Sequence, residues 1–286
     1  MRLKLSLRNS VKAALLCNLL FVLGLAGCAG PIEPTYKEND IPKLVKKICQ
    51  GEYNLDVTTK RSNTTLWIYA PLNQILDKEY GVKEDKILDE GMVDKLRNIL
   101  TTIGRVLISS DNTPEFFALL ASDINLGLDY TIIGSVLDMQ KSYSGILPWM
   151  EANRRYLVNF AIAPEAIGDS SGAHMLARNI TLPQFLSEQI AQRIAANFQD
   201  ETHKKYFKVD KFSGKFQDGT LSIEYSIQET GKPDKKIDPK KEILDIATYC
   251  IQTYEFKDFS FLELVDVLRQ DKTLFSKPAI WSRPGP

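Results

Sequence analysis

Hydrophobic residues follow two alternating periods along the chain from residue 41 onwards. Segments with an apolar residue at every third or fourth position, the period of an α-helix, are followed by pairs of strand-like segments, which are typical of β-hairpins. This order of one helix and two strands occurs four times. The predicted helices span residues 41–53, 92–108, 181–198 and 241–254. The predicted hairpins span residues 55–70, 115–138, 206–227 and 259–277.

The ends of these elements carry local signals that agree with the pattern. Asp40 stands before Pro42 at the start of the first helix, and the hydroxyl of Thr181 is placed to cap the third. Asp218 and Gly219 favour a tight turn between the strands of the third hairpin. The third hairpin is therefore the clearest of the four.

These units predict an α+β fold made of repeated helix plus β-hairpin (αββ) units. We expect an antiparallel sheet, or two sheets, with the helices packed on one face. The nearly uniform apolar segment 116–124 predicts a strand in a central position.

The first hairpin indicates that its second strand is covered on both sides. Leu66, Ile68 and Ala70 alternate with Trp67 and Tyr69 in this strand. Alternate residues of a strand point to opposite faces of the sheet, and both sets are apolar or aromatic. Both faces are therefore expected to be buried.

One segment, residues 141–180, interrupts the repeat and separates two halves, residues 41–140 and 181–286. It contains a predicted helix over residues 148–160, followed by the polar stretch 168–174. Insertions into a regular scaffold often carry function, so a binding role is one interpretation. A linker helix between the two halves is the other.

The N-terminus has the three-part pattern of a secretory signal. Four cationic residues without an acidic one precede an apolar segment over residues 13–25, which is shorter than the roughly 20 residues of a spanning helix. Small residues then lead to a cysteine. The resulting box of Leu25, Ala26, Gly27 and Cys28 resembles the lipobox of bacterial lipoproteins. An ordinary cleaved signal with a chance cysteine and an uncleaved anchor helix are the alternatives.

The resemblance implies a signal peptide of residues 1–27, cleavage before Cys28 and a diacylglycerol on the Cys28 thiol. Two or three acyl chains hold a protein on a bilayer essentially permanently, because each buried methylene contributes about 0.8 kcal/mol. Residues 28–40 would then be the lipidated cysteine and a polar tether. Ala29 stands where an aspartate signals inner-membrane retention in enterobacteria, so by analogy the periplasmic face of the outer membrane is expected.

The net charge argues against one class of partner, nucleic acid, and the positions of the remaining cysteines indicate their role. Without the signal, 32 basic and 36 acidic residues remain, which leaves no cationic excess for nucleic acid. Cys49 and Cys250 both lie on apolar helix faces, and we interpret them as buried small hydrophobic side chains. A disulfide between them is the alternative in an oxidising periplasm.

The sequence contains little that indicates catalysis. Ser170 and Ser171 lie in a stretch, residues 168–174, that superficially resembles serine-hydrolase signatures but lacks the spacing of a nucleophile elbow. His174 and His203 are the chain's two histidines, which argues against a histidine-rich metal centre. Glycine-rich phosphate loops and dinucleotide fingerprints do not occur. We predict no catalytic residue, no metal site and no cofactor.

Aromatic residues are the remaining candidates for a binding surface. Trp67, Trp149, Tyr156 and Trp281 are of the types that are enriched in interfaces, although each also suits a core. The sequence therefore favours a lipid-anchored cell-envelope protein with a binding or assembly role, in which an exposed sheet edge accepts a strand from a protein partner. An envelope hydrolase and a small-molecule or lipid carrier are the alternatives.

Overall fold

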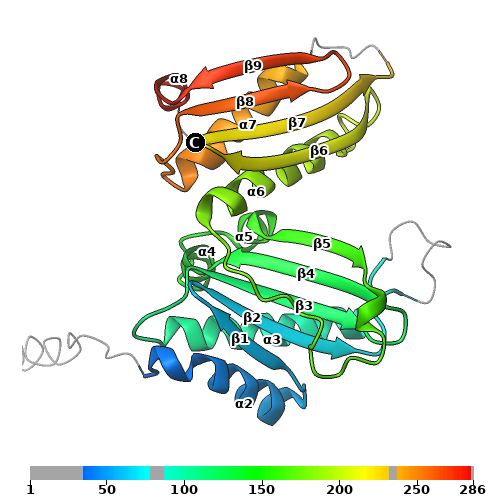
Figure 1. Ribbon diagram of the computed structural model, residues 1–286, viewed down its shortest axis with the longest axis vertical. Coiled ribbons are helices and arrows are strands. Elements are labelled where there is room, and N and C mark those ends of the chain that lie inside the picture. Colours follow the sequence, from blue (N-terminus) through cyan, green and yellow to red (C-terminus); the bar gives the residue numbers. More distant parts are fainter. Residues whose placement is uncertain (1–34, 78–86, 232–236, 285–286) are drawn as a thin grey trace, which may run out of the picture.

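The chain forms two β-sheets with their helices, as the computed structural model in Figure 1 shows. The structure describes residues 35–77, 87–231 and 237–284. The predicted signal peptide, Cys28 and most of the predicted tether lie outside these residues.

The helices and strands occur in the following places. The helical segments, with 3₁₀ turns labelled η, are η1 (Glu38–Asp40), α2 (Ile41–Tyr53), α3 (Glu90–Ile108), α4 (Val136–Tyr143), α5 (Trp149–Arg155), η2 (Pro164–Ala166), α6 (Leu182–Phe198), α7 (Pro239–Thr253) and α8 (Lys277–Trp281). The strands are β1 (Thr58–Ser62), β2 (Thr65–Leu72), β3 (Phe116–Asp123), β4 (Leu128–Ser135), β5 (Leu157–Ile162), β6 (Phe207–Gln217), β7 (Thr220–Glu229), β8 (Phe261–Asp266) and β9 (Asp271–Ser276).

The predicted α+β fold with repeated αββ units is confirmed. The four units are α2-β1-β2, α3-β3-β4, α6-β6-β7 and α7-β8-β9. The first sheet has the order β1-β2-β3-β4-β5, and the second has the order β6-β7-β8-β9. The all-apolar strand β3 is central, as expected.

Both sheets are mixed, which corrects the expectation of antiparallel sheets. Within each unit the strands pair antiparallel, but β2 pairs parallel with β3, and β7 with β8. In these pairs Leu66 lies opposite Phe117, and Leu221 lies opposite Leu262. Parallel neighbours require a crossover connection, which α3 and α7 provide.

Two segments differ from the predicted elements. The second strand of the 115–138 hairpin ends at Ser135, because its partner β3 begins at Phe116 directly opposite, and the chain beyond forms α4. The predicted helix 148–160 is also wrong in its second half. It ends at Arg155, and the next residues form β5, which pairs with β4.

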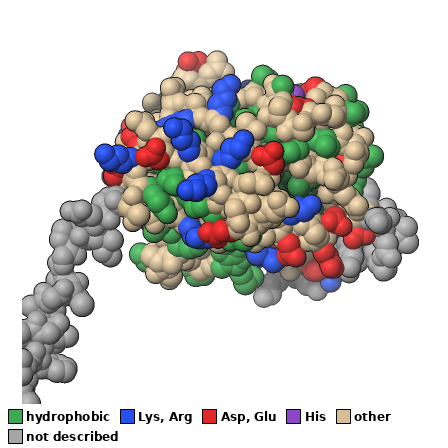
Figure 2. All heavy atoms as spheres, turned by 90° about the horizontal axis from the view of Figure 1, so that it is seen from below, with side chains coloured by type: hydrophobic (Ala, Val, Ile, Leu, Met, Phe, Trp, Pro, Cys, Tyr) green, Lys and Arg blue, Asp and Glu red, His purple; other side chains and the backbone are tan. Residues whose placement is uncertain are grey.

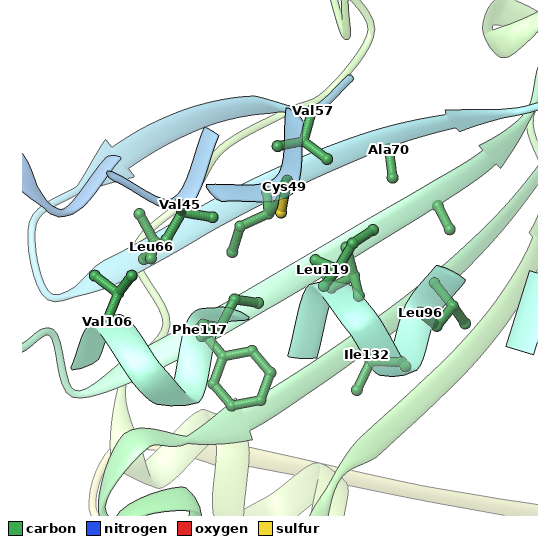
Figure 3. Packing of buried hydrophobic residues seen from close by; sticks show 14 of the residues in the cluster. Val45, Cys49, Val57, Leu66, Ala70, Leu96, Val106, Phe117, Leu119 and Ile132 are labelled. Atoms are coloured by element: carbon green, nitrogen blue, oxygen red, sulfur yellow. The ribbon is translucent and has the colours of Figure 1, made fainter. Parts of the chain in front are cut away.

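The first sheet has a covered face on each side. Side chains from α2, α3 and the sheet fill one side, where Figure 3 shows Val45, Cys49 and Leu66 among the packed residues. Trp67 and Tyr69 face the other side, against the connecting segment 163–181 and α6. The predicted burial of both faces of β2 is confirmed.

The second sheet is covered on one face by α6 and α7. Its other face carries ion pairs, such as those of Glu224 with Lys211 and Lys215. On the end of the molecule where α2 lies, Figure 2 shows basic and acidic side chains interspersed. Cys49 and Cys250 are buried and unpaired, one in each half, so the interpretation as small hydrophobic residues is confirmed.

Candidate functional site

A groove of about 780 Å³ runs between the two halves. It is lined by residues of β4, β5, the 163–181 segment, α6 and β6, and Figure 1 shows α6 lying between the two sheets. A second hollow of about 690 Å³ adjoins it. Val158 of β5 and Gln192 of α6 line both hollows, so these two residues stand where the hollows meet.

Strand β5 is the edge of the first sheet beside this groove. The N–H of Val158 donates to Oε1 of Gln192 at 3.1 Å, so this residue's main chain points away from β4. The N–H of Ala163, just beyond the strand, instead donates to the carbonyl of Gly127 at 2.8 Å, on the β4 side. Main-chain groups of alternate residues in a strand point the same way. The N–H and C=O groups of Phe160 therefore also point away from β4.

Ile162 follows the same alternation, and so two residues of β5 present unpaired main-chain groups. Within the described ranges, nothing accepts from or donates to the outward groups of Phe160 and Ile162. Their side chains are 44% and 81% exposed. An edge strand with free N–H and C=O groups and apolar side chains is a template for an additional strand.

A buried ionic cluster joins the two halves. Arg155 of α5 donates to Asp138 of α4 at 2.8 Å and to Glu151 at 3.1 Å. Arg193 of α6 reaches the same Glu151 at 2.9 Å. The hydroxyl of Tyr254, which ends α7, donates to Asp138. The cluster therefore connects α4 and α5 with α6 and α7.

The charges of this cluster compensate one another. Burial by itself raises the pKa of Glu151, but hydrogen bonds from Arg193 and Arg155 outweigh it and lower that pKa below its ordinary value. The side chains of Asp138 and Arg155 are 3% and 9% exposed. Buried charges of this kind hold a fixed geometry, because each would be costly without its partner. The cluster therefore fixes how the walls of the groove are placed.

A second polar network closes one part of the groove. Asp169 accepts from Nδ1 of His174 at 2.6 Å, and Nε2 of His174 lies 3.4 Å from both Oγ of Ser122 and Oδ1 of Asp129. Ser122 and Asp129 are cross-strand neighbours on β3 and β4, and the hydroxyl donates to the carboxylate at 2.5 Å. The hydroxyl of Tyr69 donates to the carbonyl of Asp169.

The loop around Asp169 is organised by this one carboxylate. It accepts main-chain N–H groups of Ser171, Gly172 and His174 at 2.9 to 3.0 Å. Burial opposes its ionisation, but the hydrogen bonds from His174 and Ser171 hold the pKa of Asp169 well below its usual range. Burial raises the pKa of Tyr69 to about 12, so its hydroxyl stays protonated.

A carboxylate, a base and a nucleophile are lined up here in Asp169, His174 and Ser122. The position of the Ser122 hydroxyl, however, does not allow it to attack a substrate. Ser122 is completely buried, and its proton is directed to Asp129. Ser170 and Ser171 are exposed, but no interaction of the described residues joins either hydroxyl to His174. The network instead fastens the 163–181 segment onto the first sheet.

The aromatic residues proposed from the sequence do not form one surface. Trp67 is buried, and its Nε1 donates to the carbonyl of Arg178 at 2.7 Å. Tyr156 is buried in the core beside α3, and Trp281 is half-buried against the core of the second half. Trp149 is exposed at the start of α5. Of the four, Trp67 alone lines the groove.

Sequence reasoning missed strand β5, whose free edge adjoins the groove. Phe160 and Ile162 were placed in or after a helix, although the alternation of apolar residues at 158, 160 and 162 was a signal for a strand. The pairing of Gln192 with Val158 has no sequence signal, because the two residues lie 34 positions apart.

The described residues offer neither a cluster of metal-ligating side chains nor a membrane-spanning helix. These residues contain no group of three or more His, Cys, Asp or Glu side chains that could hold a metal ion. No helix among them is long and apolar enough to cross a membrane. Comparison with family models, curated proteins and solved structures finds no match to this chain.

Proposed function

We propose that this chain is a lipid-anchored protein of the bacterial cell envelope that binds a polypeptide partner by adding a strand to β5. The observation that carries the proposal is the free edge of β5, where Phe160 and Ile162 present unpaired main-chain groups and exposed side chains beside the groove. Main-chain hydrogen bonds supply affinity in such complexes, and pockets for alternate side chains supply specificity.

The groove supports the proposal because it reaches β5 at Leu157, Val158 and Asn159, directly before the free part of the edge. A partner chain that continues from this edge past Val158 would meet residues of α6 and β6, which line the other side of the groove. These walls carry both apolar and charged side chains, including Val209, Asp210 and Lys211. The ionic cluster at Arg155 keeps the two walls in place before a partner arrives, which lowers the entropy cost of binding.

The anchor part of the proposal rests on the lipobox resemblance at Cys28. A diacylglycerol on this cysteine keeps the protein at a membrane, where the partner is met. By the analogy with Ala29, that membrane is the outer membrane and the exposed side is the periplasm.

The two alternative functions have less support. A hydrolase needs an accessible nucleophile, and Ser122 is completely buried. A carrier of small molecules or lipids needs an apolar cavity between sheet and helices, but this space in the first half is packed with side chains of α2, α3 and the sheet (Figure 3).

Site-specific photocrosslinking in cells tests the proposal. A photoreactive residue replaces Ile162, and its crosslinked products are identified by mass spectrometry. The same probe at Lys60, on the opposite edge strand β1, is the control for chance encounters. We expect one dominant protein product from position 162 that is weak or missing from position 60.

Two variants then separate the parts of the proposal. Phe160→Pro removes an N–H that has no partner within the sheet, so the fold tolerates it while an added strand loses a hydrogen bond. Loss of the product in Phe160→Pro supports strand addition, and an unchanged product overturns it. The mass of the N-terminal peptide reports the lipid on Cys28, with Cys28→Ser as the unmodified control. An unlipidated wild-type peptide overturns the anchor.

A further inference from the structure

Three large apolar side chains are exposed in the turn after α4 and at the start of α5. Ile146, Trp149 and Met150 are 74%, 55% and 71% exposed, and they lie within five residues of one another. Single exposed hydrophobic residues are ordinary, whereas a contiguous group marks an interaction site. We call these three residues the apolar tip.

The apolar tip is held in a fixed shape. Gly145 has a φ of +74°, a left-handed conformation that ends α4, and the N–H groups of Ile146 and Leu147 both donate to the carbonyl of Lys141. Leu147 is buried and holds the turn on the domain. The backbone of the apolar tip is therefore ordered before binding. Binding of the tip to another surface then costs little conformational entropy.

The apolar tip lies at the end of the first half where the described chain begins. Tyr36 bridges to Ser110, a few residues before β3, and α4 starts beside that strand, where the N–H of Val136 donates to the carbonyl of Glu115. Figure 1 shows the start of α2 and the helices α4 and α5 on the same side of the molecule. The apolar tip and the first described residues of the chain therefore lie at the same end of the first half.

The length of chain before this point limits how far the domain can stand from its anchor. Tyr36 is the eighth residue after Cys28. At 3.3–3.6 Å per residue, a fully extended chain of this length spans at most about 29 Å. A lipid on Cys28 therefore keeps this end of the domain close to the bilayer surface.

We propose that the apolar tip inserts into the headgroup layer of the membrane that holds the lipid anchor. The inference rests on the anchor in the proposed function. Tryptophan is enriched at the level of lipid headgroups, because its ring is apolar and its N–H is polar, and the neighbouring Ile146 and Met150 supply apolar area. The domain then touches the membrane at two points, the acyl chains and the tip, which fixes its orientation.

An environment-sensitive dye on single introduced cysteines tests the contact. The mature lipidated protein is reconstituted in vesicles of phosphatidylethanolamine and phosphatidylglycerol, with the dye on Ile146→Cys or Met150→Cys. The native Cys49 and Cys250 are buried, and burial raises the pKa of both thiols, so neither competes for the dye. Leu126→Cys is the matched control, since it is 60% exposed at the other end of β4.

We expect blue-shifted emission at positions 146 and 150, with quenching by nitroxide-labelled lipids at least fivefold stronger than at position 126. Equal quenching at all three positions, in protein whose N-terminal peptide carries the lipid, overturns the tip contact and leaves the anchor intact. Absence of the lipid on Cys28 overturns both. A second variant, Ile146→Ser with Met150→Ser, should leave the lipid and the fold unchanged but abolish quenching of a dye at position 149.

Discussion

The side chain of Gln192 completes the hydrogen bonding of Val158 as a neighbouring strand would. Its Nε2 donates to the Val158 carbonyl at 3.0 Å, and its Oε1 accepts the Val158 N–H at 3.1 Å. One amide side chain thus occupies the first outward-facing residue of β5 and leaves the next two free. The free part of the β5 edge therefore begins after Val158 and contains Phe160 and Ile162.

Replacing this amide should loosen the start of β5 without disturbing the core. We expect Gln192→Ala to lower the free energy of unfolding by about 1 kcal/mol, because two hydrogen bonds are exchanged for bonds to water at an accessible site. Amide hydrogen exchange at Val158 should become faster. Gln199→Ala, on a groove-lining residue whose side chain has no partner among the described residues, is the control. Unchanged exchange at Val158 would show that the pair is not formed in solution.

Gly214 allows α6 to lie directly on β6. A Cβ built at Gly214 would stand 1.8 Å from the carbonyl oxygen of Ser187, a main-chain atom that cannot move aside alone. We expect Gly214→Ala to destabilise the protein by about 3 kcal/mol, as measured by urea unfolding.

A second glycine provides the contrast for that experiment. Gly51 lies in α2, and a Cβ there meets nothing within 4 Å. Since alanine favours a helix over glycine, Gly51→Ala should stabilise the protein by about 0.5–1 kcal/mol. Similar effects of the two substitutions would contradict the close approach of α6 to β6.

Local signals in the sequence were sufficient to locate most of the repeated elements. The helix predicted at 41–53 has these bounds in the structure, since Pro42 and the apolar stripe act within a few turns. Asp218 and Gly219 both adopt the positive φ expected of their turn. The parallel pairing of β2 with β3 was not predictable in the same way, because no local residue specifies which hairpins lie side by side.

The candidate site depended on contacts that are distant in sequence. The residues of β5 fit a helical period as well as a strand period, and the neighbouring β4 decides between them. The bond between Asp169 and His174 spans five residues, but Ser122 and Asp129 reach the same histidine from other strands. The sequence therefore revealed the loop and not the network that holds it.

We expect the stability of the fold to depend strongly on both members of the buried ion pair between Arg155 and Asp138. Arg155→Met leaves the Asp138 carboxylate, with 3% of its side chain exposed, without its cation. We expect a loss of about 3–5 kcal/mol in urea unfolding. Adding Asp138→Asn to this variant removes the uncompensated charge and should restore part of the loss. If the double variant is no more stable than Arg155→Met, the pair is not the source of the effect.

Acid should weaken the 163–181 segment through Asp169. The folded-state pKa of this carboxyl lies well below its value of about 3.9 in an unfolded chain, because hydrogen bonds from His174 and Ser171 favour the charged form. Its stabilising contribution is therefore fully present above about pH 4, and it is lost as the pH falls towards the folded-state pKa.

Asp169→Asn should lower the free energy of unfolding at pH 5, and the difference from the wild type should be smaller at pH 3. Urea unfolding at both pH values measures the two differences, with the exposed Asp258→Asn as the control. A deficit that is the same at pH 5 and pH 3 would mean that the charge on Asp169 does not hold the loop.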